Sequence, residues 1–113
     1  MVSESDIQDG LRQELRRGSL ILAVLGLLRA EHYGYTLRKA LAAQGVEIDE
    51  GALYPMLRRL ETQGLLTSHW REEAKRNKRF YRLSPEGEAA LSRLADDWRA
   101  MNTSIDQILK ETP

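Results

Sequence analysis

The chain has 113 residues, of which 42% are hydrophobic, and it contains no cysteine. This length allows one domain with a modest core, and the lack of cysteine excludes a disulfide framework and a thiolate metal site. No apolar run reaches the roughly 18 residues that a membrane-spanning helix needs, and the first ten residues lack the basic flank and apolar centre of a signal peptide. We therefore expect a cytoplasmic protein without a membrane association.

The net charge is zero, but the charges are unevenly distributed. Residues 50–83 contain eight basic and four acidic side chains, so the rest of the chain carries a net charge of −4. A neutral total thus conceals a basic segment. Such a segment either binds a polyanion or is simply a solvated surface, and we favour the first.

The first part of the chain predicts two helices separated by a glycine. Three apolar residues recur every four positions and predict an amphipathic helix over residues 5–17. Gly18 is expected to end this helix, and Ser19 to cap a second helix over residues 20–29. The second helix is apolar on nearly all sides, so part of its cover is expected to come from a second subunit.

The middle of the chain predicts two more helices with a short strand between them. Residues 35–44 form a helix that Gly45 ends. Residues 46–48 alternate between apolar and polar side chains, which predicts a short edge strand. Asp49 is a good N-cap for the next helix, which Gly64 ends. The buried stripe of that helix consists of Leu53, Met56, Leu57 and Leu60.

A hairpin follows, with strands over residues 66–71 and 79–83 and a turn over residues 74–77. Asn77 either forms this turn or reads an adenine base, and its place in the hairpin favours the turn. Trp70 is expected to pack beneath the hairpin. The order helix, glycine and hairpin is that of a winged helix-turn-helix, in which one helix and one charged loop lie on the same side of the domain.

A long terminal helix begins at Ser84, a good N-cap, and Pro85, whose missing N–H costs nothing at the first helical position. Its apolar residues are spaced alternately by three and four, which predicts a heptad seam. Such a seam packs on the chain's own first helices or on a partner's copy, and we expect both. The seam consists of Leu91, Leu94, Trp98, Met101, Ile105 and Ile108.

The predicted fold is therefore mainly α with a small β-hairpin. Residues 1–83 form a winged helix-turn-helix domain, and residues 84–113 form a C-terminal dimerisation helix.

Several segments resemble the PadR-like family of transcriptional regulators, in its short form with a single C-terminal helix. The resemblance covers nearly the whole chain, and the Leu-Tyr-Pro and Arg-Arg-Leu-Glu motifs within residues 53–61 are its most specific parts. The matching segments are residues 20–28, 33–37, 51–61, 64–65 and 81–87.

The resemblance implies a homodimeric DNA-binding repressor that dimerises through its terminal helix and releases DNA when it senses a signal such as a small, often aromatic, effector. One feature departs from the family pattern. The recognition helix is the helix that follows Asp49. Three acidic residues lie at its start, where the family more often has small neutral residues: Glu47, Asp49 and Glu50. Carboxylates there either repel phosphates or specify cytosine, whose N4 amino group donates to them.

A duplex presents dense negative charge, so a DNA-binding surface needs several cations directed at phosphates. In the recognition helix, Tyr54 offers a hydroxyl to a phosphate, while Arg58 and Arg59 suit a guanine edge or a phosphate. Pro55 is tolerated near the start of the helix because little N–H bonding is lost there. The predicted hairpin over residues 66–83 is the wing of this fold. Its DNA-binding candidates are Lys75, Arg76, Asn77, Lys78 and Arg79.

Trp98 lies in the middle of the predicted seam. If the seam pairs about a two-fold axis, two copies of Trp98 approach each other and can sandwich a flat apolar effector, with Asp97 and Met101 as neighbours. The alternative, which we favour, is that Trp98 is a core residue of the interface.

We predict no enzyme activity and no cofactor, because the sequence contains no nucleophile–base constellation. His32 and His69 lack further ligands, so no metal site is predicted, and His32 is expected to be a surface or capping residue. Two functions remain. The first, which we favour, is a dimeric repressor that binds a near-palindromic operator in double-stranded DNA. The second is a winged-helix interaction module, an antirepressor or adaptor, that does not bind DNA.

Overall fold

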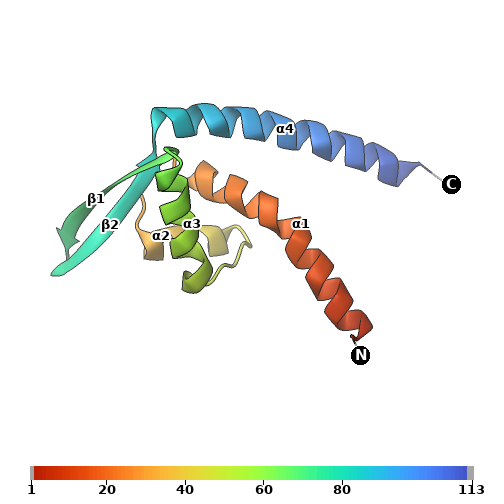
Figure 1. Cartoon of the computed structure of the whole chain (residues 1–113), viewed down its shortest axis with the longest axis horizontal. Helices are drawn as coiled ribbons and strands as arrows, with labels where there is room; N and C mark the ends of the chain where they lie inside the picture. The colour runs from red at the N-terminus through yellow and green to blue at the C-terminus, as the bar shows by residue number, and fades with distance from the viewer. Residues whose placement is uncertain (1, 112–113) are drawn as a thin grey trace.

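The computed structural model describes residues 2–111. The described chain forms four helices and one two-stranded antiparallel sheet (Figure 1), which is the predicted fold class. None of these helices is long and apolar enough to cross a membrane. In chain order the elements are α1 (Glu4–Leu27), α2 (Gly34–Ala43), α3 (Glu50–Thr62), β1 (Leu66–Glu73), β2 (Arg76–Leu83) and α4 (Pro85–Lys110).

Helix α1 runs without a break through Gly18, so the predicted helix end and the predicted cap at Ser19 are wrong. A glycine inside a helix costs only about 1 kcal/mol relative to alanine, which the good helix formers on either side offset. The helix begins instead at Ser3, whose hydroxyl accepts a hydrogen bond from the N–H of Asp6 at 3.1 Å. The Asp6 carboxylate accepts the N–H of Ser3 in return, which completes a capping box.

Helices α2 and α3 end as their glycines predict. Gly45 and Gly64 have φ angles of 80° and 83°, in the left-handed region that glycine enters without strain. Asp49 caps α3 as predicted, because its side chain accepts the N–H of Ala52 at 2.8 Å. The predicted edge strand over residues 46–48 is wrong, since this segment pairs with no strand and its two apolar side chains pack on the core.

The hairpin is longer and its turn tighter than predicted. The strands pair from Leu66 opposite Leu83 to Glu73 opposite Arg76, which leaves only Ala74 and Lys75 as the loop. Both loop residues have positive φ angles, 54° and 64°, the pattern of a type I′ turn whose twist matches that of the strands. The predicted four-residue turn is therefore wrong.

Asn77 lies in β2 opposite Glu72, so the prediction that it forms the turn is wrong as well. Position 77 belongs to the paired part of the hairpin because two loop residues are enough to reverse the chain.

The segment between α1 and α2 pairs with the open edge of the sheet. The N–H of His32 donates to the carbonyl of Tyr81 at 3.1 Å, and the N–H of Tyr81 donates to the carbonyl of His32 at 2.8 Å. The His32 ring also contacts the hydroxyl of Thr36, with Nδ1 3.0 Å from Oγ1. The hairpin is thereby attached to the start of α2.

The core lies where the C-terminal half of α1, the helices α2 and α3, and the base of the hairpin meet. The first half of α1 and most of α4 extend away from it as two diverging arms (Figure 1). The Cα radius of gyration is 16.8 Å, whereas a compact domain of this length has roughly 13 Å. The largest fully buried side chains are Val24, Leu25, Leu28, Leu37, Leu41, Leu53 and Leu57.

Candidate nucleic-acid interface

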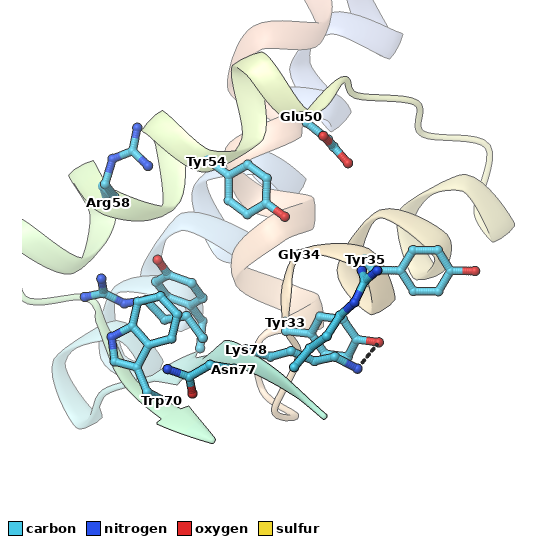
Figure 2. Close-up of a pocket in the computed structure, with 12 residues that line it drawn as sticks. Tyr33, Gly34, Tyr35, Glu50, Tyr54, Arg58, Trp70, Asn77 and Lys78 are labelled. Atoms are coloured by element: carbon cyan, nitrogen blue, oxygen red, sulfur yellow. Dashed lines mark hydrogen bonds between the residues drawn. The ribbon is translucent and has the colours of Figure 1, made fainter. Parts of the chain in front are cut away.

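A groove of about 780 Å³ lies between the start of α2, helix α3 and the hairpin (Figure 2). The structure thus brings the predicted recognition helix and wing together on one concave surface. Of the predicted DNA-binding residues, those that line the groove are Tyr54, Arg58, Arg76, Asn77, Lys78 and Arg79.

The other three predicted residues lie beside this groove. Arg59 is exposed on α3, about 100° around the helix from Arg58. Lys75 is exposed in the two-residue turn at the tip of the hairpin. Pro55 is the sixth residue of α3 and is exposed, about one turn deeper than the position at which proline is most easily accommodated.

Residues that the sequence did not assign to the interface also line the groove. Tyr33, Gly34 and Tyr35 come from the start of α2, and Trp70 comes from β1. Because Trp70 is 59% exposed, the prediction that it packs beneath the hairpin is wrong. Strand alternation offered the missing signal, since Trp70 and Arg79 stand directly opposite each other and opposite residues share a face.

The cations of this surface fall into two groups. Arg58, Arg59, Lys75 and Arg76 are exposed and have no ion-pair partner within residues 2–111. They can therefore turn toward phosphates without breaking a contact inside the protein.

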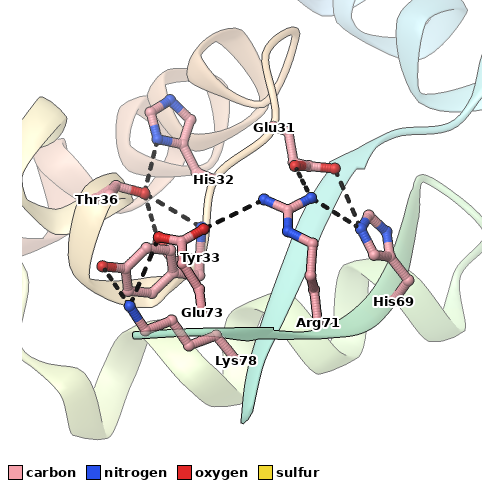
Figure 3. A network of polar contacts seen from close by, with 8 residues as sticks. All are labelled: Glu31, His32, Tyr33, Thr36, His69, Arg71, Glu73 and Lys78. Atoms are coloured by element: carbon pink, nitrogen blue, oxygen red, sulfur yellow. Dashed lines mark hydrogen bonds and ion pairs between the residues drawn. The ribbon is translucent and has the colours of Figure 1, made fainter. Parts of the chain in front are cut away.

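The second group consists of the cations that are engaged within the protein, Lys78 and Arg79. The side chain of Lys78 is only 18% exposed. Its ammonium lies 4.5 Å from the centre of the Tyr33 ring and donates to the hydroxyl of that tyrosine at 3.3 Å. The carboxylate of Glu73 lies 3.7 Å away (Figure 3). Lys78 thus connects the hairpin to the start of α2 more than it faces solvent.

The same face of the hairpin carries a second set of ion pairs (Figure 3). Arg71 binds Glu31 at 2.8 Å, and His69 lies 3.4 Å from the other oxygen of that carboxylate. The Arg71 guanidinium also lies 3.7 Å from the centre of the Phe80 ring. Together with the His32–Tyr81 pairing, these contacts fix the segment between α1 and α2 to the wing.

The acidic residues at the start of α3 are largely engaged within the protein. Glu50 pairs with Arg38 at 2.7 Å, and Asp49 serves as the N-cap. Glu47 is exposed, and its backbone carbonyl accepts from Arg16 at 3.2 Å. Since an ion pair presents a weaker field than a free carboxylate, the repulsion of phosphates at this entrance is smaller than the sequence alone suggests.

Tyr81 lies in the wall of the groove and is almost completely buried. Burial raises the pKa of its phenol above the ordinary value. The positive charge of Arg79 lowers this pKa by a smaller amount, and the negative charge of Glu61 raises it. The phenol is therefore neutral at physiological pH and adds no negative charge to the groove.

The comparisons with known proteins agree with this geometry. Residues 21–93 match the model of the transcriptional regulator PadR-like family. Transcriptional regulator Rv3488 of Mycobacterium tuberculosis is 39% identical over 79 residues, which are 70% of this chain and 71% of that protein.

Solved structures show the same fold. A PadR family transcriptional regulator from Eggerthella lenta is 38% identical, with a TM-score of 0.88 over 96% of both chains. A transcriptional regulator from Clostridium thermocellum is 29% identical, with a TM-score of 0.78 over 86% of this chain and 99% of that one. These relatives are regulators rather than enzymes, as the sequence predicts. The chain belongs to the PadR-like family of transcriptional regulators, and α2, α3 and the hairpin form its winged helix-turn-helix.

Proposed function

We propose that the protein is a homodimeric repressor that binds a near-palindromic operator through α3 and the hairpin. The observation that carries the proposal is the cluster of four exposed cations, without ion-pair partners in the described chain, on α3 and at the hairpin tip. A recognition helix reads base edges in a major groove, and cations around it bind the flanking phosphates. Since its target is chromosomal DNA, we place the protein in the cytoplasm.

The exposed apolar residues of α4 support a dimer. Five residues of the seam are between 42% and 66% exposed, although an apolar heptad seam is stable in water only against another helix. Three apolar residues in the first half of α1 are equally uncovered, and the two arms diverge, so they do not cover each other. A second copy covers both. The exposed residues are Leu94, Trp98, Met101, Ile105 and Ile108 in α4, and Ile7, Leu11 and Leu15 in α1.

This proposal keeps the predicted division of the chain. Residues 1–83 contain the DNA-binding elements, and residues 84–113 form the dimerisation helix, to which the first half of α1 adds apolar contacts.

In such a dimer Trp98 has two candidate roles. It packs as a core residue of the seam, or it borders a site for a flat aromatic effector together with Asp97 and Met101. Its 46% exposure in a single chain leaves an aromatic face available to either. Fluorescence in a Trp70→Phe background separates the roles: quenching by flat aromatic dyes supports the effector site, and no quenching across a varied panel leaves only the packing role.

The alternative, an interaction module without DNA affinity, rested on the acidic residues at the start of α3. Two of the three are engaged by Arg38 and by the helix cap, so this support is weak. Selection of bound duplexes from a genomic or random pool distinguishes the two functions. Enrichment of a near-palindrome with half-sites about 34 Å apart supports the repressor.

The cations are tested by titrating a selected duplex at several salt concentrations. Arg58→Gln and Lys75→Gln each remove one phosphate contact, so each should weaken binding and lower the slope of log affinity against log salt by about one. Arg93→Gln removes an exposed cation of α4 far along the chain from the groove and should change neither. A wild-type protein that ignores every duplex at low ionic strength contradicts the proposal.

A further inference from the structure

We propose that Glu61, Ser68 and Arg79 form a lock that holds the hairpin against α3, and that Arg79 positions the wing instead of contacting DNA. This inference rests on the proposed DNA-binding function. It also changes the assignment of Arg79, which the sequence places among the DNA contacts.

The wing lock, as we call these three residues, connects three elements in a closed triangle. Arg79 of β2 places Nη2 2.9 Å from Oε1 of Glu61 in α3. Its Nε donates to Oγ of Ser68 in β1 at 2.9 Å. The Ser68 hydroxyl in turn donates to Oε2 of Glu61. Both carboxylate oxygens are therefore occupied, and the guanidinium is oriented by two bonds instead of one.

The surroundings of the wing lock favour a fixed geometry. The side chains of Arg79 and Glu61 are 37% and 26% exposed, so their attraction is less screened than that of a surface pair. The guanidinium carbon lies 5.5 Å from the centre of the Trp70 ring and 5.7 Å from that of Tyr81. These are the distances of cation–π contacts. A guanidinium held in this way must break several contacts before it reaches a phosphate.

The position of the wing lock explains why it matters for DNA. Glu61 lies three residues after Arg58 and seven after Tyr54, so all three share one face of α3. The chain passes from α3 to β1 through Gly64, a residue without a side chain to resist rotation. A bond across the two elements therefore sets the angle of the wing and the width of the groove.

Simple electrostatics and the wing lock predict opposite effects for Glu61→Gln. The change removes a negative charge from the DNA-facing side and releases a cation, which by charge alone strengthens DNA binding. If the wing lock sets the groove, binding instead weakens by about tenfold, the size expected for a pair of directly coupled residues.

The experiment measures the affinity for one selected duplex across salt concentrations in a double-mutant cycle. Glu61→Gln and Arg79→Gln should each weaken binding about tenfold without changing the salt slope, and the double variant should be no weaker than either. Arg76→Gln is the matched control, because Arg76 lines the same groove without an ion-pair partner in residues 2–111. It should weaken binding and lower the slope by about one.

A second readout needs no DNA. In a Trp98→Phe background the remaining indole is Trp70, which lies against Arg79. Both single variants should shift its emission and raise its quenching by acrylamide, while Arg76→Gln should not. Circular dichroism before each measurement shows that the variants are folded.

Two results overturn the inference. One is tighter DNA binding by Glu61→Gln together with a lower salt slope for Arg79→Gln, which makes Arg79 a phosphate contact. The other is unchanged Trp70 fluorescence in both variants, which means that no such bond holds the wing. A wild-type protein that binds no duplex contradicts the proposed function instead, and the Trp70 measurement still decides whether the wing lock exists.

Discussion

Gly34 and Gly87 both lie so close to other atoms that a side chain would clash, but the atoms it would meet differ. A Cβ on Gly34 at the start of α2 would lie 2.7 Å from ring carbons of Tyr54. A Cβ on Gly87 in the first turn of α4 would meet the backbone carbonyl of Leu65 and lie 3.1 Å from Leu83. Tyr54 is a partly exposed side chain that can swing away, whereas the Leu65 carbonyl belongs to the main chain. The same methyl group therefore has different consequences at the two sites.

We predict that Gly34→Ala weakens DNA binding about as much as Tyr54→Ala does, because it displaces the Tyr54 ring from the groove, and that it changes stability little. Gly87→Ala should instead lower the free energy of unfolding by about 1 to 3 kcal/mol, the usual cost of overpacking a filled site. Denaturant unfolding and DNA titration of both variants check this. If Gly34→Ala binds DNA as tightly as the wild type, the position of Tyr54 is not part of the interface.

At the scale of helices and strands, the boundaries that act locally were predictable. Asp49 and Ser84 each mark the start of a helix, and Gly45 and Gly64 each follow the end of one. These signals act on backbone groups within a few residues, so a single sequence shows them. The prediction that Gly18 ends a helix is wrong, because a glycine inside a helix lowers its stability only modestly. Local sequence does not show whether a glycine follows a helix or lies within it.

Contacts between distant segments were not predictable. The pairing of His32 with Tyr81 fixes the hairpin to the start of α2, but it involves only backbone groups that every residue carries. In the same way, composition identified the cations of the wing but not the pairing of Arg79 with Glu61. A single sequence gives the inventory of charges on an interface, while the fold decides which of them are neutralised.

Helix α1 offers a direct test at this scale. Gly10 lies inside α1, and a Cβ added there would contact nothing beyond the adjacent backbone of its own helix. Gly10→Ala should therefore raise helicity and stabilise the protein by about 0.5 to 1 kcal/mol. Gly45→Ala is the matched control, because a Cβ there also meets nothing, but its φ of +80° strains any residue with a side chain. Gly45→Ala should therefore lower the free energy of unfolding. Circular dichroism and thermal unfolding measure both, and lower helicity in Gly10→Ala would contradict a helical conformation around residue 10.

The shape of the described chain supports the proposal that two copies associate. Its principal extents are 59 × 37 × 25 Å, and the longest helix, α4, carries only one buried residue, Gly87. Complete burial of an exposed apolar side chain contributes roughly 1.5 to 3 kcal/mol. Covering the exposed part of five such residues in each copy therefore favours association. In the proposed dimer two copies of α3 lie at a fixed separation, which is what a palindromic operator requires.

We predict that Ile105→Lys separates the dimer, because it places a charge within the apolar seam, where it finds no partner. Thr103→Lys adds the same charge on the opposite side of α4, about 160° around the helix from Ile105, and should leave the dimer intact. Sedimentation should show a monomer only for the first variant, and its melting temperature should lose the dependence on protein concentration that a dimer has. Its affinity for a palindromic duplex should fall toward that for a single half-site, while Thr103→Lys keeps the difference. If Ile105→Lys remains dimeric, or if the wild type is a monomer at working concentration, the exposed seam of α4 is not the dimer interface.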